Sequence, residues 1–434
     1  MDKMADVLGR AGAWCGQNKY LSAIKNAFQN FMPLTIAGAI GVLWCNVLVN
    51  ETTGLGMFFK PIMALDFLNP AFQAVNFCTI SCITVGITLG IAQEIGVWNM
   101  GAERAGYIPG LVGLAAWLSV TNTSHMVDGA KEAFTGIAGN ELGATGLFTG
   151  MIIGVLSVEL FCFFEKQDAL KIKMPEQVPP GVARAFEVLV PATITLIITA
   201  CIGSACYNLT GLYLNDVIKN GIQGPLGAVG ATIPGVMIIY LVIMLFWLVG
   251  IHGNNMLSAV KEALFTPLAL ENVEKFNKGE KPTNIINMYA LQMWGEFGGS
   301  GVTIGLVIAI IIFGKREDNK AIATLSLVPG LFNINETVTF GIPMVLNPIL
   351  GIPFVVAPLI TIIIGYVLTV IGFCPVACLT VPWTTPPIVF GFLACGANVM
   401  GAVTQAILIV VSTVIYVPFL ISYEKYQNKQ AAEA

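Results

Sequence analysis

Histidine 252 lies where an apolar stretch ends and could make hydrogen bonds to a ligand. His252 follows the apolar run 241–251 and precedes Gly253-Asn254-Asn255. An ionisable group at the end of such a run is a candidate functional residue, because an apolar environment makes its presence costly. The alternative is a structural histidine that caps the end of a helix, where positive charge is favoured.

Glutamate 336 is the one carboxylate of the segment 329–343, among apolar side chains and the amides of Asn333 and Asn335. Desolvation makes the charged form of such a group costly, which suits a residue that accepts or shares a proton with a substrate. The alternative is a structural carboxylate at a helix N-terminus after Asn335. A long regular helix is excluded by the helix-breaking residues Pro329, Gly330, Gly341 and Pro343. We therefore expect a short turn or half-helix that dips into the membrane.

Three tryptophans, Trp247, Trp294 and Trp383, could form a platform for a sugar. An aromatic face packs on the apolar face of a pyranose, while amides hydrogen-bond its hydroxyls. Each tryptophan could equally be an anchor at the membrane interface. The amides that could complete a sugar site are Asn254, Asn255, Asn333, Asn335 and Gln292.

The amino-acid composition of the whole chain indicates that these candidate residues belong to a membrane protein. Of 434 residues, 56% are hydrophobic and only 11% are charged, and the mean hydropathy is +0.79. Soluble domains carry about a quarter charged residues, so the chain is predicted to be an all-α polytopic membrane protein. Long uninterrupted apolar stretches argue against a β-barrel. The net charge of −4 makes a nucleic acid partner unlikely, and ATP-driven transport is excluded because no Walker loop is present.

Hydropathy predicts about ten spans, several of them short for a membrane, which takes ~20 helical residues to cross. An amphipathic surface helix is expected over 1–30, before the first span. After the loop 171–187, apolar pieces are repeatedly interrupted by glycine, proline, asparagine and tryptophan, which is typical of the broken helices that line transporter sites. The spans are expected near 31–49, 72–93, 107–120, 146–164, 188–209, 233–251, 301–313, 352–373, 376–396 and 401–422.

Positive residues in the short loops predict cytoplasmic N- and C-termini. They cluster before the first span and between the fourth and fifth spans. Strict alternation then places the polar turn 314–320 outside, although it contains Lys315, Arg316 and Lys320. A further crossing within 255–300 would resolve this conflict. The alternative is that the polar turn is shielded in a different way.

The ten cysteines lie mostly in apolar runs, and they include the pairs Cys78/Cys82 and Cys374/Cys378. We interpret them as small residues that pack helices. Metal ligation is the alternative, but no histidine or carboxylate accompanies them, and we expect no metal site and no cofactor.

Two segments carry a resemblance to a known family. Residues 247–255, WLVGIHGNN, and 332–348, FNINETVTFGIPMVLNP, resemble the membrane subunit, enzyme IIC, of the bacterial phosphotransferase system. The similarity is strongest to the lactose, cellobiose and diacetylchitobiose group, and it extends in order and hydropathy over nearly all of the chain.

The resemblance implies a homodimer with two re-entrant hairpins. It divides the chain into a dimerisation scaffold at 31–210, a transport half at 211–423 and a cytoplasmic tail at 424–434. His252 and Glu336 would bind the sugar near its phosphorylated hydroxyl, and Asn335, Trp247 and Trp383 would hold its rings. The phosphate would come from a phosphocysteine of a separate IIB subunit that is charged through IIA, because this chain contains no such domain.

The expected function is therefore a sugar permease of the bacterial cytoplasmic membrane that takes up a β-linked disaccharide, with diacetylchitobiose or cellobiose favoured. An ion-coupled secondary transporter, with His252 and Glu336 as a proton relay, is the alternative. The sequence does not identify the sugar, because discrimination depends on a few hydrogen bonds. It also does not show whether the site opens inward or outward, or whether Trp294 or Glu296 contacts the substrate.

Overall fold

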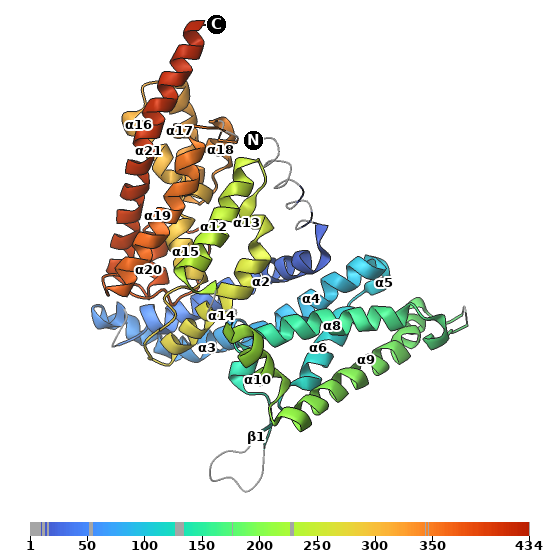
Figure 1. Cartoon of the computed structure of the whole chain (residues 1–434). Helices are drawn as coiled ribbons and strands as arrows, with labels where there is room; N and C mark the ends of the chain where they lie inside the picture. The colour runs from blue at the N-terminus through green and yellow to red at the C-terminus, as the bar shows by residue number, and fades with distance from the viewer. Residues whose placement is uncertain are drawn as a thin grey trace. The chain divides into compact units, whose positions relative to one another are not determined.

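The computed structural model describes residues 10, 14, 17–51, 55–125, 134–175, 177–225, 230–342, 344–345 and 347–433. Within these residues the regular secondary structure is helical apart from one antiparallel pair of two-residue strands, β1 (Ser124–His125) and β2 (Phe134–Thr135) (Figure 1). The all-α fold predicted from the composition is confirmed. The chain forms two compact units, one of residues 17–38 and 74–227 and the other of 1–16, 39–73 and 228–434.

Close helix packing holds the unit of 17–38 and 74–227 together. Helix α4 packs against α6 and α8, and glycines permit the approach: a Cβ on Gly113 would lie 2.3 Å from the Ala92 Cβ. Small residues at helix contacts are characteristic of membrane bundles. The elements of this unit are α4 (Ile83–Met100), α5 (Ala102–Ala105), α6 (Ile108–Val120), α7 (Gly139–Leu142), α8 (Leu147–Glu165), α9 (Pro180–Thr210), α10 (Leu214–Ile218), η4 (Ile80–Cys82), η5 (Asp168–Leu170) and η6 (Lys219–Gln223).

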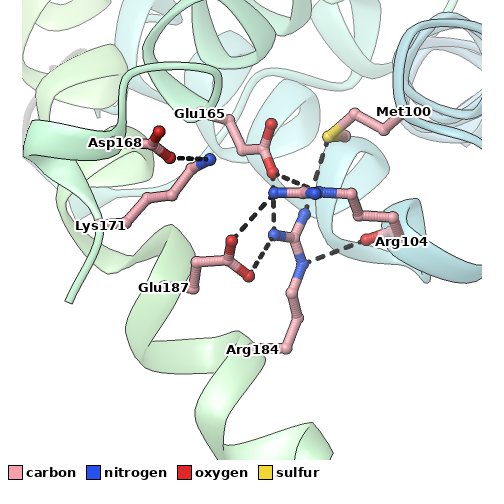
Figure 2. Close-up of polar contacts among 7 residues, drawn as sticks. All are labelled: Met100, Arg104, Glu165, Asp168, Lys171, Arg184 and Glu187. Carbon is pink, nitrogen blue, oxygen red and sulfur yellow. Dashed lines mark hydrogen bonds and ion pairs between the residues drawn. The ribbon is translucent and has the colours of Figure 1, made fainter. Parts of the chain in front are cut away.

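A four-residue ion cluster fastens one end of this unit (Figure 2). Arg104 of α5 pairs with Glu165 at 2.8 Å and with Glu187 at 2.9 Å. Arg184 of α9 reaches the same two carboxylates at 2.9 and 2.8 Å. Glu165 is buried, so its charge depends on these arginines. The cluster joins α5 to the end of α8 and the start of α9.

The second unit contains the segments rich in glycine, proline and asparagine. In Figure 1, helices α16, α17, α19 and α21 stand side by side, and α16 and α19 both contact α21. The elements of the unit from residue 228 onward are α12 (Ile233–Leu248), α13 (Gly253–Met256), α14 (Ser258–Asn277), α15 (Met288–Gly295), η7 (Ser300–Val302), α16 (Ile304–Phe313), α17 (Glu317–Leu331), α18 (Glu336–Gly341), α19 (Gly351–Val370), α20 (Val389–Ala394) and α21 (Val399–Glu433).

Residues 39–73 of the same unit contain shorter elements, η1 (Trp44–Leu48), η2 (Leu55–Met57) and η3 (Lys60–Leu68). Two helices contribute to both units, α2 (Lys19–Leu43) and α3 (Asn69–Cys78). The surface helix expected over 1–30 is only partly described, and from Lys19 onward its residues continue in α2, with Pro33 inside the helix.

Six helices of the described residues are long and apolar enough to cross a membrane, and the bent pair 288–302 and 304–313 makes up to seven. Two shorter apolar helices, α6 and α12, correspond to further predicted spans. The segment 376–396 does not form the expected span: only Val389–Ala394 is helical there. Its prolines at 382, 386 and 387 remove the backbone donors that a continuous helix needs.

The polar turn 314–320 lies at the C-terminal end of α21. The buried carboxylate of Glu424 accepts hydrogen bonds from the main-chain N–H groups of Lys315 and Arg316, at 2.9 and 3.3 Å. Arg316 also hydrogen-bonds to Asp318 and holds the pKa of that carboxyl below its usual range. The turn therefore lies beside the last part of α21. Among the described helices that qualify as spans, only 351–370 and 399–433 lie between the turn and the C-terminal end, and this even number agrees with the contact. The further crossing within 255–300 stays a prediction.

Candidate functional site

The side chain of His252 is held in place by a hydrogen bond to one of its ring nitrogens. It is the residue before α13, and its Nδ1 accepts a hydrogen bond from the Asn255 main-chain N–H at 3.3 Å. A ring nitrogen that accepts carries no proton, so the neutral ring has its proton on Nε2. His252 thus caps the start of α13 rather than the end of α12. Its Nε2–H is the donor that a neutral imidazole offers to a ligand.

Trp247 supports the His252 ring from the last turn of α12. The two ring centroids are 4.4 Å apart at an angle of 49°, and Phe354 of α19 meets the Trp247 ring edge-on at 6.3 Å. Trp247 is buried. Its contact with His252 is a packing contact that fixes the orientation of the imidazole.

A buried ion pair lies close to the histidine. Lys261 of α14 pairs with Glu296, and the hydroxyl of Tyr240 donates to the same carboxylate at 2.7 Å. Only 7% of the Lys261 side chain and 17% of the Glu296 side chain are exposed. Lys261 also donates to the side-chain oxygen of Asn254 at 3.2 Å. Lys261, Glu296 and Glu336 are the charged side chains close enough to act on the His252 ring.

Asn254 and Asn335 both bind Ser300. The Asn254 amide donates to the Ser300 hydroxyl at 2.9 Å, and the Asn335 amide donates to the Ser300 main-chain carbonyl at 2.8 Å. Ser300 belongs to a tight turn whose glycines at 298, 299 and 301 all have positive φ, which glycine adopts at no steric cost. A Cβ on Gly299 would lie 2.7 Å from the Asn335 side chain. The glycines thus allow the segment 333–336 to approach.

Asn333 joins this turn to the loop of Trp383. Its side-chain oxygen accepts from the Gly298 N–H at 2.6 Å. Its amide group donates to the main-chain carbonyls of Trp383 and Thr385. The side chain of Asn333 is therefore occupied by backbone groups of two other segments, and its role here is to hold them in place.

Three predicted site residues, Glu336, Trp383 and Asn255, are exposed within the described structure. Glu336 is the first residue of α18 and is not buried as its apolar neighbourhood suggested, because the preceding Asn335 occupies the buried position. Trp383 has 45% of its surface exposed. The short helix α18 agrees with the predicted break in the segment 329–343, of which Pro343 lies outside the described residues.

Trp294 lies in the core, with Gly365 of α19 so close that an added Cβ would be 2.3 Å from the indole ring.

The predicted residues His252, Asn254, Asn333, Asn335 and Glu336 belong to one compact unit together with all three tryptophans. No local pattern in the sequence singles out Lys261, Tyr240 or Ser300. Their contacts form only in the folded protein, because their partners are distant in the sequence: Lys261 and Glu296 are 35 residues apart.

Long apolar helices interrupted by short turns, with amides, a histidine and a carboxylate at the breaks, define a multi-pass membrane transport protein. Comparison with known families identifies which one. The family model described as "Phosphotransferase system, EIIC" matches residues 25–358, and the chain belongs to this family of sugar permeases.

Characterised relatives align over nearly the whole chain. The oligo-beta-mannoside-specific EIIC component of Bacillus subtilis (strain 168) is 32% identical, over 98% of this chain and 94% of the relative. The cellobiose-specific EIIC component of Lactococcus lactis subsp. lactis (strain IL1403) is 30% identical, over 98% of both. The crystal structure of ChbC, the IIC component of the N,N'-diacetylchitobiose-specific system, superposes with a TM-score of 0.88, 29% identity and 97% coverage of both chains.

Proposed function

We propose that this permease binds a β-linked disaccharide and carries it across the bacterial cytoplasmic membrane, where a separate IIB subunit phosphorylates a 6-hydroxyl. The observation that carries the proposal is that the half-buried amide of Asn333 links the backbone of the Trp383 loop to the segment of Glu336, and that the side chains of both Glu336 and Trp383 are exposed. Asn333 lies three residues before Glu336 and hydrogen-bonds to the Trp383 carbonyl. An aromatic face and a carboxylate on two linked segments suit a sugar ring with a reacting hydroxyl.

In the proposed reaction the sugar 6-hydroxyl attacks the phosphorus of a phosphocysteine on IIB. An O–P bond forms, the S–P bond breaks, the cysteine thiolate leaves, and the hydroxyl proton passes to Glu336. His252 orients the hydroxyl or the carboxylate through its Nε2–H. Trp247 acts on the sugar through the His252 ring, while Asn254, Asn255 and Asn335 supply amides to the hydroxyls.

The substrate class is supported by the relatives, which are named for oligo-β-mannosides, cellobiose and N,N'-diacetylchitobiose. All three are β-linked sugars, and we assign the same class to this chain. We also propose that the protein is a homodimer whose scaffold lies in 31–210 and whose transport half lies in 211–423. The buried core position of Trp294 favours a packing role over sugar contact for that residue.

Secondary transport without phosphorylation is the second candidate function. It is favoured by one observation, the buried Lys261–Glu296 pair, because additional ionisable groups near His252 could form part of a proton path. The hydrogen bond from Tyr240 and the contact with Asn254 instead fit a pair that positions the amides of the site.

The test is equilibrium binding of radiolabelled diacetylchitobiose, cellobiose and mannobiose to the purified protein in detergent, without an ion gradient. Glu336→Gln and His252→Ala are measured beside the wild type, with Glu317→Gln, an exposed carboxylate outside the site, as the matched control. We expect ion-independent micromolar binding of one sugar, about tenfold or more weaker in both site variants and unchanged in the control.

Binding that requires protons or sodium would overturn the phosphotransferase proposal in favour of secondary transport. Unchanged binding in both Glu336→Gln and His252→Ala would remove these residues from the site. Phosphorylation is then tested by adding the cognate phosphorylated IIB protein and measuring sugar phosphate, which we expect to be abolished in Glu336→Gln.

A further inference from the structure

Two buried cysteines face each other across the neck of the loop that carries Trp383. Cys374 follows α19 and Cys395 follows α20, and their sulfur atoms are 3.9 Å apart. Both residues are buried, with exposed fractions of 1% and 4%. The pair encloses residues 375–394, with Trp383 near the middle.

The neck of this loop is already ordered by backbone hydrogen bonds. The N–H groups of Cys378 and Leu379 donate to the Ala394 carbonyl at 2.8 and 3.1 Å. The Cys374 N–H donates to the Leu368 carbonyl at 3.0 Å. The two chain segments are therefore held together independently of the sulfur atoms, which keeps the thiols within reach of one another.

We propose that Cys374 and Cys395 form a redox-sensitive pair that closes to a disulfide and thereby shifts the Trp383 loop. A disulfide brings the sulfur atoms to about 2.05 Å, so closure draws the two sides of the neck together. Asn333 ties Trp383 and Thr385 to the turn at Gly298, and the shift therefore acts on the segment that contains Glu336.

The oxidant in this proposal is hydrogen peroxide. The Cys374 thiolate attacks one peroxide oxygen, an S–O bond forms, the O–O bond breaks, and water leaves after protonation. The Cys395 thiolate then attacks the oxidised sulfur, an S–S bond forms, and the S–O oxygen leaves as a second water. Two thiols lose two electrons and the peroxide gains them.

The experiment treats the purified full-length protein with hydrogen peroxide, alkylates remaining thiols under denaturing conditions and maps the peptides by mass spectrometry. We expect one linked peptide pair containing Cys374 and Cys395, two hydrogen atoms lighter than the reduced pair, while Cys378 stays alkylated. Sugar binding is measured in parallel. The oxidised protein should bind about fivefold more weakly, of the order of one lost aromatic contact, and dithiothreitol should restore binding.

Cys378→Ser is the matched control, because it removes a buried neighbour and leaves the pair intact; it should respond to peroxide as the wild type does. Cys374→Ser and Cys395→Ser should each abolish the linked peptide and the response of binding to peroxide. The proposal would be overturned by any of three results: both cysteines are alkylated after oxidation, the disulfide forms with Cys378 instead, or the Cys374–Cys395 disulfide forms without an effect on sugar binding. The effect on binding rests on the proposed sugar site, but peptide mapping does not, so a failure of either is recognised separately.

Discussion

The side chain of Asn333 reaches across fifty residues of sequence to the main-chain carbonyl of Trp383. Asn333 has a left-handed backbone, with φ +63°, which asparagine tolerates better than most residues. This conformation directs its amide to the Trp383 loop while its oxygen accepts from Gly298. One residue thus sets the position of the exposed tryptophan relative to the segment of Glu336.

Replacing Asn333 with aspartate tests this framework. Asn333→Asp keeps an acceptor for Gly298 but places a second oxygen against the carbonyls of Trp383 and Thr385, where a donor is needed. We expect about 1–3 kcal/mol weaker sugar binding, measured by titration of the sugar that the wild type binds. Asn208→Asp, at an exposed position, should bind as the wild type does, and wild-type affinity in Asn333→Asp would refute the assignment.

The Lys261–Glu296 pair should show strong coupling in a double-mutant cycle. Lys261→Met or Glu296→Gln alone leaves a buried charge without its partner, and we expect each to lower the free energy of unfolding by about 3–5 kcal/mol. The double variant should recover part of this loss, since no charge is then unpaired. Thermal unfolding in detergent gives the three values, and additive losses would show that the pair is not coupled in the folded protein.

Residues of the candidate site could be predicted where the signal was local. His252 and Glu336 stand out because each is a single ionisable residue beside glycines, prolines and asparagines that break helices. Lys261 and Ser300 could not be selected in this way, because their partners come from segments that meet only after folding. The framework around the site depends on those distant contacts.

The spans show the same limit. Helix α19 was expected over 352–373 and lies at Gly351–Val370, since a long apolar run in a membrane favours a single helix. Helix α19 tolerates Pro353 and Pro358, but the segment 376–396 has three prolines within six residues, at 382, 386 and 387, and only 389–394 is helical. Hydropathy reflects how apolar a segment is, but it does not show whether the segment has the main-chain N–H groups that a continuous helix needs.

Packing of Trp294 against Gly365 predicts a steric cost for a single methyl group. In Gly365→Ala the added Cβ would meet the indole at 2.3 Å, and overpacking of this kind costs about 1–3 kcal/mol. We expect a lower unfolding temperature for the purified protein. Gly181→Ala in α9, where an added Cβ meets no atom within 4 Å, should be neutral or slightly stabilising, and equal stability of the two variants would argue against the Trp294 contact.

Contacts of Glu424 with Lys315 and Arg316 predict the side of the membrane on which the turn 314–320 lies. Single cysteines replacing Lys315 and Lys429 should react with a membrane-impermeant maleimide from the same face, above the background labelling of the wild type, because both positions are exposed at the C-terminal end of α21.

Asn398→Cys is the control, since Asn398 immediately precedes the first residue of α21, the helix 399–433 that qualifies as a span. It should label from the opposite face. Intact cells and inverted vesicles distinguish the two faces, and the predicted cytoplasmic C-terminus places the first pair of labels in inverted vesicles alone. Labelling of Lys315→Cys and Lys429→Cys from different faces would contradict the position of the turn beside α21, because the Glu424 contacts require the turn and the helix end to lie together.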